Sequence, residues 1–253
     1  KEAQRYGDIN VVEAGTQIDG KLAIADASTW NLSQDAAYVH YVDNETIGGL
    51  QFAGVPKANA PLVSDFSSSI LSAPVDVTQF GMIYAGAQKN IGPAGLTLVI
   101  VKDEILGKAG RIIPSMLDYQ KQIEAESMYN TPPVFSVFVS MLNLRWLKSK
   151  GGVAEIGKEN IAKANALYRE IDRNPLFRGT VAVEDRSNMS VCFVTENPEL
   201  EKPFLKFAEE RGCIGIKGHR SSGGFRASLY NALPITSVHV LVEAMQDFAE
   251  QNA

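Results

Sequence analysis

The run "LTLVIV", at residues 96–101, is apolar except for one threonine. A strand with one solvated face alternates polar and apolar residues, whereas a continuously apolar run is typical of a strand covered on both faces. Three more short apolar runs precede it, at 36–42, 60–66 and 81–87. Short strands of this kind predict a mixed or parallel sheet in an α/β fold, where functional groups lie on the loops at strand ends.

After residue 129 the short apolar runs give way to longer stretches. A Pro-Pro turn opens a long apolar stretch that ends at Gly151 and Gly152, which predicts a helix with a proline start and a glycine end. Beyond the glycines the sequence predicts an amphipathic helix at 155–173, a strand at 189–195, a helix at 198–212, short strands at 213–216 and 225–230, and a helix at 237–250. We therefore predict a first domain over residues 1–150 and a smaller α+β domain over residues 151–253.

Charge and cysteine usage exclude several classes of function. The net charge of −5 and the pI of about 5.3 argue against a general affinity for nucleic acid or anionic membranes. No apolar run approaches the roughly 18 residues that span a bilayer. Cys192 and Cys213 lie in apolar segments without a Cys-x-x-Cys pattern, so we predict buried free thiols and no metal site. Buried free thiols fit a reducing, cytoplasmic location.

The stretch "YAGAQKNIGPAG", at residues 84–95, places Lys89 among small residues directly after a predicted strand. Taken alone, Lys89 reads as a solvated surface lysine. The glycines and alanines around it would let the backbone approach a ligand closely. Asp65 ends another predicted strand, where it could also cap the following "SSS" turn. A lysine and an aspartate at strand ends suit pyridoxal phosphate, because the amine forms a Schiff base and the carboxylate keeps the pyridine nitrogen protonated.

Five motifs occur along the chain in this order: "HYVDNETIGG", "DFSSSILSAPVDV", "GAQKNIGPAG", "YNTPP" and "KGHRSSGGFRASLYNA". With these motifs the chain resembles the phosphoserine aminotransferase family, which belongs to the class V pyridoxal phosphate enzymes. The resemblance runs from the first residue to the last helix. It implies a fold-type I α/β architecture like that of aspartate aminotransferase. The large domain would have a mixed, mostly parallel sheet and would be incomplete at its N-terminus, and a smaller C-terminal α+β domain would follow.

The resemblance implies roles for residues of the first domain. Lys89 matches the lysine that forms the Schiff base and transfers the proton between the substrate and the cofactor. Because proton transfer needs a neutral amine, we expect a depressed pKa for Lys89. Asp65 matches the partner of the pyridine nitrogen, Gln88 matches a residue at the cofactor phosphate, and Thr46 matches a further cofactor-binding residue.

Other matched residues imply a dimer and a substrate pocket. Asn130 and Thr131 match residues that reach the cofactor phosphate of the neighbouring subunit, which implies a homodimer with active sites at the interface. The same "NTPP" string also suits a turn at a helix start, and both roles are compatible. Arg226 matches the arginine that binds the substrate α-carboxylate, although by itself it would read as a surface residue paired with a carboxylate. His219 and Arg220 match residues around the distal anion.

The activity implied is transamination between phosphoserine and 2-oxoglutarate in serine biosynthesis. In the biosynthetic direction glutamate is the donor and 3-phosphohydroxypyruvate the acceptor, and a related phosphorylated 4-hydroxythreonine of pyridoxine biosynthesis is a further substrate. An alternative is a class V enzyme acting on serine or alanine with glyoxylate. The pair His219-Arg220 argues against that alternative, because those substrates carry no distal anion.

The resemblance also implies a segment before "KEAQRYGDINVV". In the family this segment provides a glycine-rich turn for the cofactor phosphate, an aromatic residue that stacks on the pyridine ring, and basic residues for the distal anion. No Gly-Gly-Arg-Gly-like string occurs in the 253 residues. We therefore expect the chain by itself to expose core surface and to be inactive or nearly so. The alternative function is then a non-catalytic dimerisation or interaction module.

Overall fold

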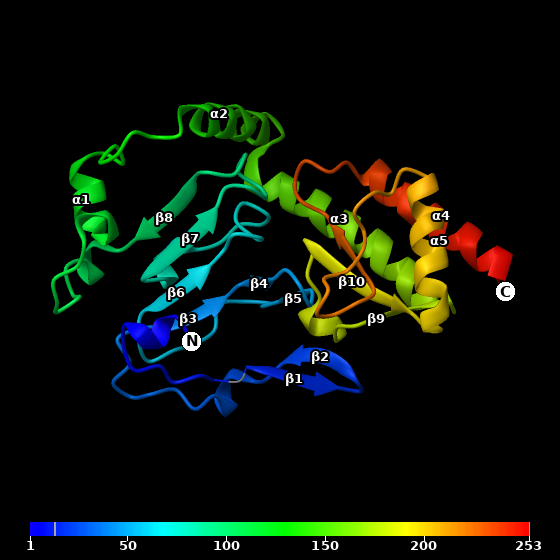
Figure 1. Cartoon of the computed structure of the whole chain (residues 1–253), viewed down its shortest axis with the longest axis horizontal. Helices are drawn as coiled ribbons and strands as arrows, with labels where there is room; N and C mark the ends of the chain where they lie inside the picture. The colour runs from blue at the N-terminus through cyan, green and yellow to red at the C-terminus, as the bar shows by residue number, and fades with distance from the viewer. Residues whose placement is uncertain (13, 253) are drawn as a thin grey trace.

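A four-stranded mixed sheet organises the first half of the chain in the computed structural model, which describes residues 1–12 and 14–252. Its strands are β3 (Val39–Val42), β6 (Leu62–Asp65), β7 (Met82–Gly86) and β8 (Thr97–Val101). They are ordered β3-β6-β7-β8; β3, β6 and β7 are parallel, and β8 is antiparallel to β7 (Figure 1). All four strands coincide with runs predicted from the sequence, and the predicted mixed, mostly parallel sheet is confirmed.

One face of this sheet holds the hydrophobic core of the first half. The buried cluster is made of Tyr41, Leu62, Phe66, Ile70, Phe80, Ile83, Ala85, Ala87 and Ile91. Side chains alternate along a strand, so the register partners Asp65 and Tyr84 point to the opposite face from Ile83. Asp65 and Tyr84 are both half-buried. The polar groups at the strand ends therefore lie outside the apolar cluster, where a ligand can reach them.

Residues 96–101 were predicted to form a strand covered on both faces, and the prediction of full cover is wrong. The strand exists, but β8 pairs only with β7 among the described residues, and Leu98 and Ile100 are 39% and 37% exposed. Nearby in sequence, the helix α2 (Val134–Ser149) exposes Phe135 at 73% and Phe138 at 52%. An apolar run indicates that a strand should be covered, but it does not indicate which part of a protein covers it.

A second, antiparallel sheet organises the other half. Its strands are β9 (Phe177–Gly179), β10 (Ser190–Thr195) and β11 (Phe225–Ser228), in the order β11-β10-β9. The helices α3 (Gly152–Arg173), α4 (Glu201–Glu210) and α5 (Ile235–Asn252) pack on it (Figure 1). Phe204 is central to this core, with edge-on contacts to Phe177, Phe225 and Phe248. The boundary that we propose near residue 150 separates this cluster from the first one.

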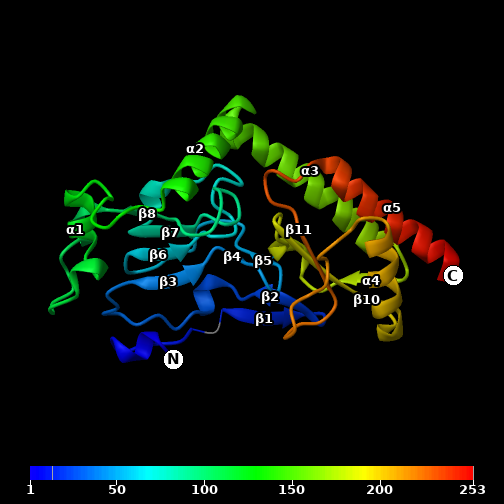
Figure 2. The ribbon, with the colours of Figure 1, turned by 45° about the horizontal axis from the view of Figure 1, so that its top comes forward.

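The helices α2 and α3 and the hairpin of β1 and β2 both connect the halves. Figure 2 shows α2 and α3 following one another above both sheets, with the break at Gly151, whose φ of +91° ends α2 where the sequence predicted. On the other side, the hairpin of β1 (Gly15–Ile18) and β2 (Lys21–Ile24) reaches the second half. Leu22 exchanges two backbone hydrogen bonds there, donating to Thr180 and accepting from Ala182.

The short elements complete the description. They are the hairpin strands β4 (Asn44–Glu45) and β5 (Leu50–Gln51), the helix α1 (Tyr119–Glu124), and the 3₁₀ turns Ala3–Arg5, Ala27–Thr29, Val77–Gln79, Asp103–Ile105, Ser115–Leu117, Val183–Asp185 and Pro198–Leu200. None of the helices within the described ranges combines the length and apolarity needed to cross a bilayer.

The predicted strand at 213–216 is not present. These residues form the turn that follows α4: the Cys213 N–H bonds the Ala208 carbonyl, and Gly215 has a φ of +77°. Ile214 is 82% exposed and Cys213 is only half-buried, so the prediction of two buried thiols holds for Cys192 alone. Four apolar residues are too few to distinguish a strand from a helix-terminating turn.

The most buried lysine of the described chain is Lys163, in α3, which the sequence reading did not single out. Its side chain is 1% exposed, and Nζ donates to the carbonyls of Leu229, Tyr230 and Leu233 at 2.9–3.1 Å. Burial lowers the pKa of Lys163 to about 8. The amine therefore fixes the chain after β11 onto α3, and its role is structural.

Replacing Lys163 by Met should lower the free energy of unfolding by about 2–4 kcal/mol, because three carbonyls lose their donor. The folded pKa lies below the unfolded value, so between about pH 8 and pH 10 the unfolded state binds more protons and wild-type stability rises with pH. The difference between wild type and Lys163→Met should therefore grow over that range in denaturant titrations. Lys158→Met, at an exposed ion pair on the same helix, should change stability by less than about 0.5 kcal/mol; an equal loss in both variants would contradict the assignment.

Candidate active site

The amine of Lys89 lies where the two halves of the chain meet. Lys89 follows β7 in a tight turn in which the N–H groups of Ile91 and Gly92 both bond the Ala87 carbonyl. A Cβ at Gly92 would come 2.3 Å from the Ser140 hydroxyl of α2, so glycine is required for helix and turn to pack this closely. Lys89 Nζ donates to Thr46 Oγ1 at 2.7 Å. The structure thus brings together two residues 43 positions apart that the sequence assigned to one site.

The surroundings of Lys89 favour its neutral form. Partial burial lowers the pKa of the amine, and the positive charge of Arg226 lowers it further. The carboxylates of Asp65 and Glu45 oppose this by raising the pKa, but burial is the larger effect. The net shift is downward, in the direction expected for a lysine that transfers protons.

Asp65 stands at the end of β6, next to β7 in the sheet. Its Oδ1 accepts a hydrogen bond from the Ser67 N–H at 2.8 Å, so the capping role considered from the sequence is present. Its charge also reaches Lys89, since it is the largest of the charge effects on that amine. Both roles of Asp65 are compatible, because the cap uses only one carboxylate oxygen.

Arg226 approaches the same region from β11, where it pairs in register with Cys192 of β10. Its Nε is buried and has no hydrogen-bond acceptor within the part of the chain that the structure describes. A buried guanidinium donor without an acceptor is costly, and an anionic ligand would relieve that cost. Gln88, beside Lys89, is exposed and folds back so closely that a Cβ at Gly86 would lie 2.5 Å from its Oε1.

Four predicted residues make no hydrogen bond to Lys89 or Thr46 within the described ranges. Asn130 and Thr131 are exposed in the loop between α1 and α2, where Asn130 Nδ2 donates to the Thr131 carbonyl. His219 and Arg220 belong to the loop before β11, and His219 Nδ1 lies 2.7 Å from Ser221 Oγ. No hydrogen bond in the described ranges joins these four residues to Lys89. Their roles in binding remain predictions.

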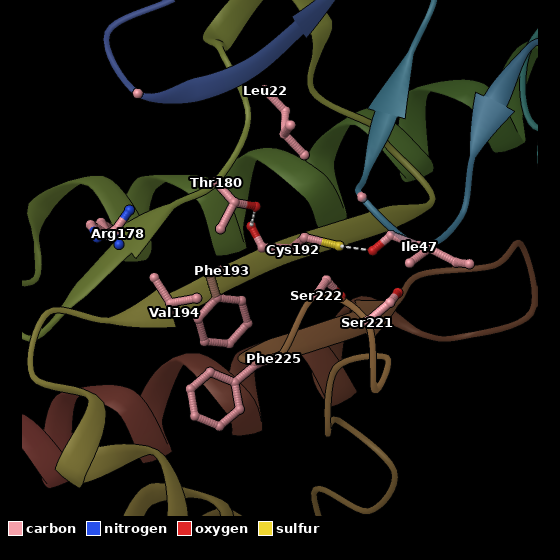
Figure 3. A pocket seen from close by; sticks show the side chains of 13 residues that line it. Leu22, Ile47, Arg178, Thr180, Cys192, Phe193, Val194, Ser221, Ser222 and Phe225 are labelled. Atoms are coloured by element: carbon pink, nitrogen blue, oxygen red, sulfur yellow. Dashed lines mark hydrogen bonds between the residues drawn. The ribbon is translucent and has the colours of Figure 1, made fainter. Parts of the chain in front are cut away.

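A pocket of about 340 Å³ is lined in part by Ile47 and Gly48 of the turn at 46–49 (Figure 3). Gly20, Leu22, Ile47, Gly48, Arg178, Thr180, Cys192, Phe193, Val194, Ser221, Ser222, Gly223 and Phe225 line it, and Lys89 is not among them. In Figure 3 the Cys192 thiol points to Ile47, whose carbonyl it contacts at 3.3 Å. Burial raises the pKa of Cys192 to about 11, so this thiol is a poor nucleophile and the expected inert role is supported.

The sequence reading missed one residue close to the amine. Glu45 precedes Thr46, and its carboxylate charge acts on Lys89. The signal was available in "NETIGG", where a carboxylate stands directly before a threonine and two glycines. Only the folded chain shows that this motif turns back toward Lys89.

The groups around Lys89 fit pyridoxal phosphate. An amine with a lowered pKa can attack an aldehyde, and the neighbouring carboxylate of Asp65 suits a protonated pyridine nitrogen. The unpaired Nε of Arg226 fits the carboxylate of an amino-acid substrate. Within the described residues, no group of three or more His, Cys, Asp or Glu side chains is placed to hold a metal ion.

Comparison with known proteins agrees with this chemistry. A profile of the family "Aminotransferase class-V" matches residues 1–241. The chain is 58% identical to a phosphoserine aminotransferase of Acinetobacter baumannii over 252 residues, which are all of this chain and 70% of that protein.

Solved structures are also similar. The phosphoserine aminotransferase of Bacillus circulans subsp. alkalophilus superposes with a TM-score of 0.85 at 42% identity, covering 91% of this chain and 64% of that one. The enzyme of Trichomonas vaginalis, with pyridoxal phosphate bound, superposes with a TM-score of 0.85 at 39% identity, covering 88% of this chain and 64% of that one. This chain thus spans about two thirds of its relatives. It belongs to the class V aminotransferase family and, within it, to the phosphoserine aminotransferases.

Proposed function

We propose that this protein is a pyridoxal phosphate-dependent aminotransferase that exchanges an amino group between phosphoserine and 2-oxoglutarate. The observation that carries the proposal is the cluster around Lys89: an amine with a lowered pKa, held by the Thr46 hydroxyl and faced by Asp65. Glutamate and 3-phosphohydroxypyruvate are the substrates of the biosynthetic direction. The related phosphorylated hydroxythreonine of pyridoxine biosynthesis is a further proposed substrate.

The bound cofactor supplies an aldehyde for the amine and a ring that accepts an electron pair from the substrate. Asp65 holds the proton on the ring nitrogen, since an ionised carboxylate beside that nitrogen stabilises its charged form. Lys89 in its neutral form would take the proton from the substrate α-carbon and deliver it to the C4′ carbon of the cofactor. Thr46 orients the lysine through the 2.7 Å hydrogen bond, and Gln88 contributes to the cofactor phosphate site.

Substrate recognition is proposed for the cationic groups of the second half. Arg226 binds the α-carboxylate; the support is that its Nε has no acceptor among the described residues and that its charge acts on Lys89. His219 and Arg220 bind the distal anion, which is the phosphate of phosphoserine or the side-chain carboxylate of glutamate. A cationic site that accepts either anion lets one pocket serve both half-reactions.

We further propose a cytoplasmic homodimer. Asn130 and Thr131 are exposed, and among the described residues they make no hydrogen bond to Lys89, which suits residues that contact the cofactor of a second subunit. The exposed apolar side chains of α2 lie just after these residues in sequence and would be covered by such a contact. The free thiols Cys192 and Cys213 fit a reducing compartment.

The test of function is a visible titration with pyridoxal phosphate of the full-length protein, with the N-terminal segment that the resemblance implies, followed by single half-reactions. The variants below are made in the same full-length protein. We expect a new absorbance band on adding the cofactor and its loss on adding glutamate or phosphoserine. Alanine should leave the band in place, because it lacks a distal anion. A band that forms but does not respond to phosphoserine would contradict the substrate assignment.

Lys89→Ala should abolish the cofactor band and lower turnover by at least about a thousandfold, because both the covalent link and the proton transfer are lost. Borohydride reduction of the loaded wild type, followed by peptide mapping, should place the cofactor on the peptide that contains Lys89. Lys206→Ala removes a lysine that is 82% exposed on α4 and should change neither measurement. Turnover near the wild-type level in Lys89→Ala would show that another residue carries the chemistry.

Arg226→Lys should raise KM for both glutamate and phosphoserine by about 10–100-fold, because an ammonium cannot replace a two-pronged guanidinium contact with a carboxylate. The turnover number should fall less than KM rises. Arg169→Lys, on the exposed face of α3, is the matched control and should leave both constants unchanged. A fall in turnover without any change in KM would argue against a role for Arg226 in substrate binding.

A further inference from the structure

The turn that carries Thr46 is held from within by Glu45. The Glu45 carboxylate accepts the Ile47 N–H at 3.0 Å through Oε1 and the Gly48 N–H through Oε2. A Cβ at residue 48 would lie 2.9 Å from Oε2, so glycine leaves room for this carboxylate. Both oxygens of Glu45 are therefore committed to consecutive backbone N–H groups of the turn, and Thr46 lies in sequence between Glu45 and these two N–H groups.

The same turn is held from outside by the second half of the chain. Cys192 Sγ contacts the Ile47 carbonyl at 3.3 Å, as Figure 3 shows, and the Ser187 N–H donates to the Gly49 carbonyl at 2.9 Å. Gly49 has a φ of +82°, and a Cβ there would lie 2.7 Å from the Ser190 carbonyl. The turn thus packs against β10, and its residue Thr46 accepts the hydrogen bond from Lys89.

We propose that Glu45 is a positioning residue that fixes the turn at 46–49 and so holds the Thr46 hydroxyl against the Lys89 amine. The inference rests on the proposed function, because it gives Lys89 its importance. Glu45 makes no hydrogen bond to Lys89 in the described chain; it acts through Thr46. If this turn were not fixed, the Lys89 amine would lose the hydrogen bond to the Thr46 hydroxyl, now 2.7 Å long. The Lys89 side chain could then adopt other rotamers.

Loss of Glu45 should also change the titration of Lys89. The charged groups that act on this amine are Asp65 from β6, Glu45 from β4 and Arg226 from β11. Glu45 raises the pKa of Lys89, and a hydrogen bond from the ammonium to the Thr46 hydroxyl stabilises the same charged form. Removing Glu45 therefore takes away two contributions of the same sign, and the pKa of Lys89 should fall further below the ordinary lysine value.

The experiment measures the reactivity of Lys89 in the protein without cofactor. Acetic anhydride labelling at a series of pH values, followed by peptide mapping, gives the midpoint at which Lys89 becomes reactive. In Glu45→Ala the midpoint should move to lower pH, and in Glu45→Gln it should move by less, because the amide keeps one acceptor for the turn. Asp76→Asn alters a comparable carboxylate, which accepts the Thr78 N–H in an exposed turn, and should leave the midpoint in place.

A double-mutant cycle separates positioning from charge alone. If Glu45 acts through Thr46, the shift caused by Glu45→Ala should be smaller in a Thr46→Val background than in the wild type. Equal shifts in both backgrounds, or an unchanged midpoint in both Glu45 variants, would overturn the proposal. If Glu45→Ala does not give a cooperative thermal transition, Glu45→Gln replaces it in the same cycle.

The outcome is independent of the proposed function. Wild-type protein that forms no absorbance band with pyridoxal phosphate would contradict the function, while the labelling profile would still report on Glu45. Conversely, a normal cofactor band with an unshifted midpoint in the Glu45 variants would contradict only the positioning role.

Discussion

The buried side chain of Asn44 is the contact on which the geometry of the site depends. It is 0% exposed, donates to the Ser68 hydroxyl at 2.8 Å in the first half of the chain, and accepts from the Ser187 hydroxyl of the second half. Ser187 Oγ in turn accepts the N–H groups of Met189 and Ser190 at the start of β10. A buried amide is expensive to leave unpaired, at about 1–3 kcal/mol for each lost partner. The hairpin that bears Thr46 is therefore held in one place between the two sheets.

Three cations, of which Lys163 is buried and Lys89 and Arg226 are half-buried, show how the same chemistry can serve structure or function. The Lys163 amine has three carbonyl acceptors, so its hydrogen bonding is complete without a ligand. Its burial therefore stabilises the fold. Lys89 has a single hydroxyl partner, and its pKa is lowered. Arg226 retains a buried Nε without an acceptor. Groups that are incompletely satisfied by the protein are the ones available to a cofactor or a substrate.

Much of the fold could be predicted locally. The strands β3, β6, β7 and β8 follow from short apolar runs, and α2 follows from its proline start and glycine end. The turn at 213–216 was mistaken for a strand, because its apolar residues terminate α4 instead of pairing. Lys163 was missed for another reason: it stands in no pattern that separates a committed polar group from a solvated one. Glu45 was missed although it stands in the "NETIGG" motif.

The sequence by itself determined the order of the elements and, through its resemblance to a family, predicted Lys89, Asp65 and Thr46 as site residues. Tertiary structure decided which polar groups meet. Thr46 and Lys89 are 43 positions apart, and only the docking of the hairpin against β10 brings the hydroxyl to 2.7 Å from the amine. The tertiary structure also showed that β8 lies at the edge of the described sheet and that Lys163 is buried. The physical reason is that hydrogen bonding and burial depend on distances across the fold, which local patterns do not encode.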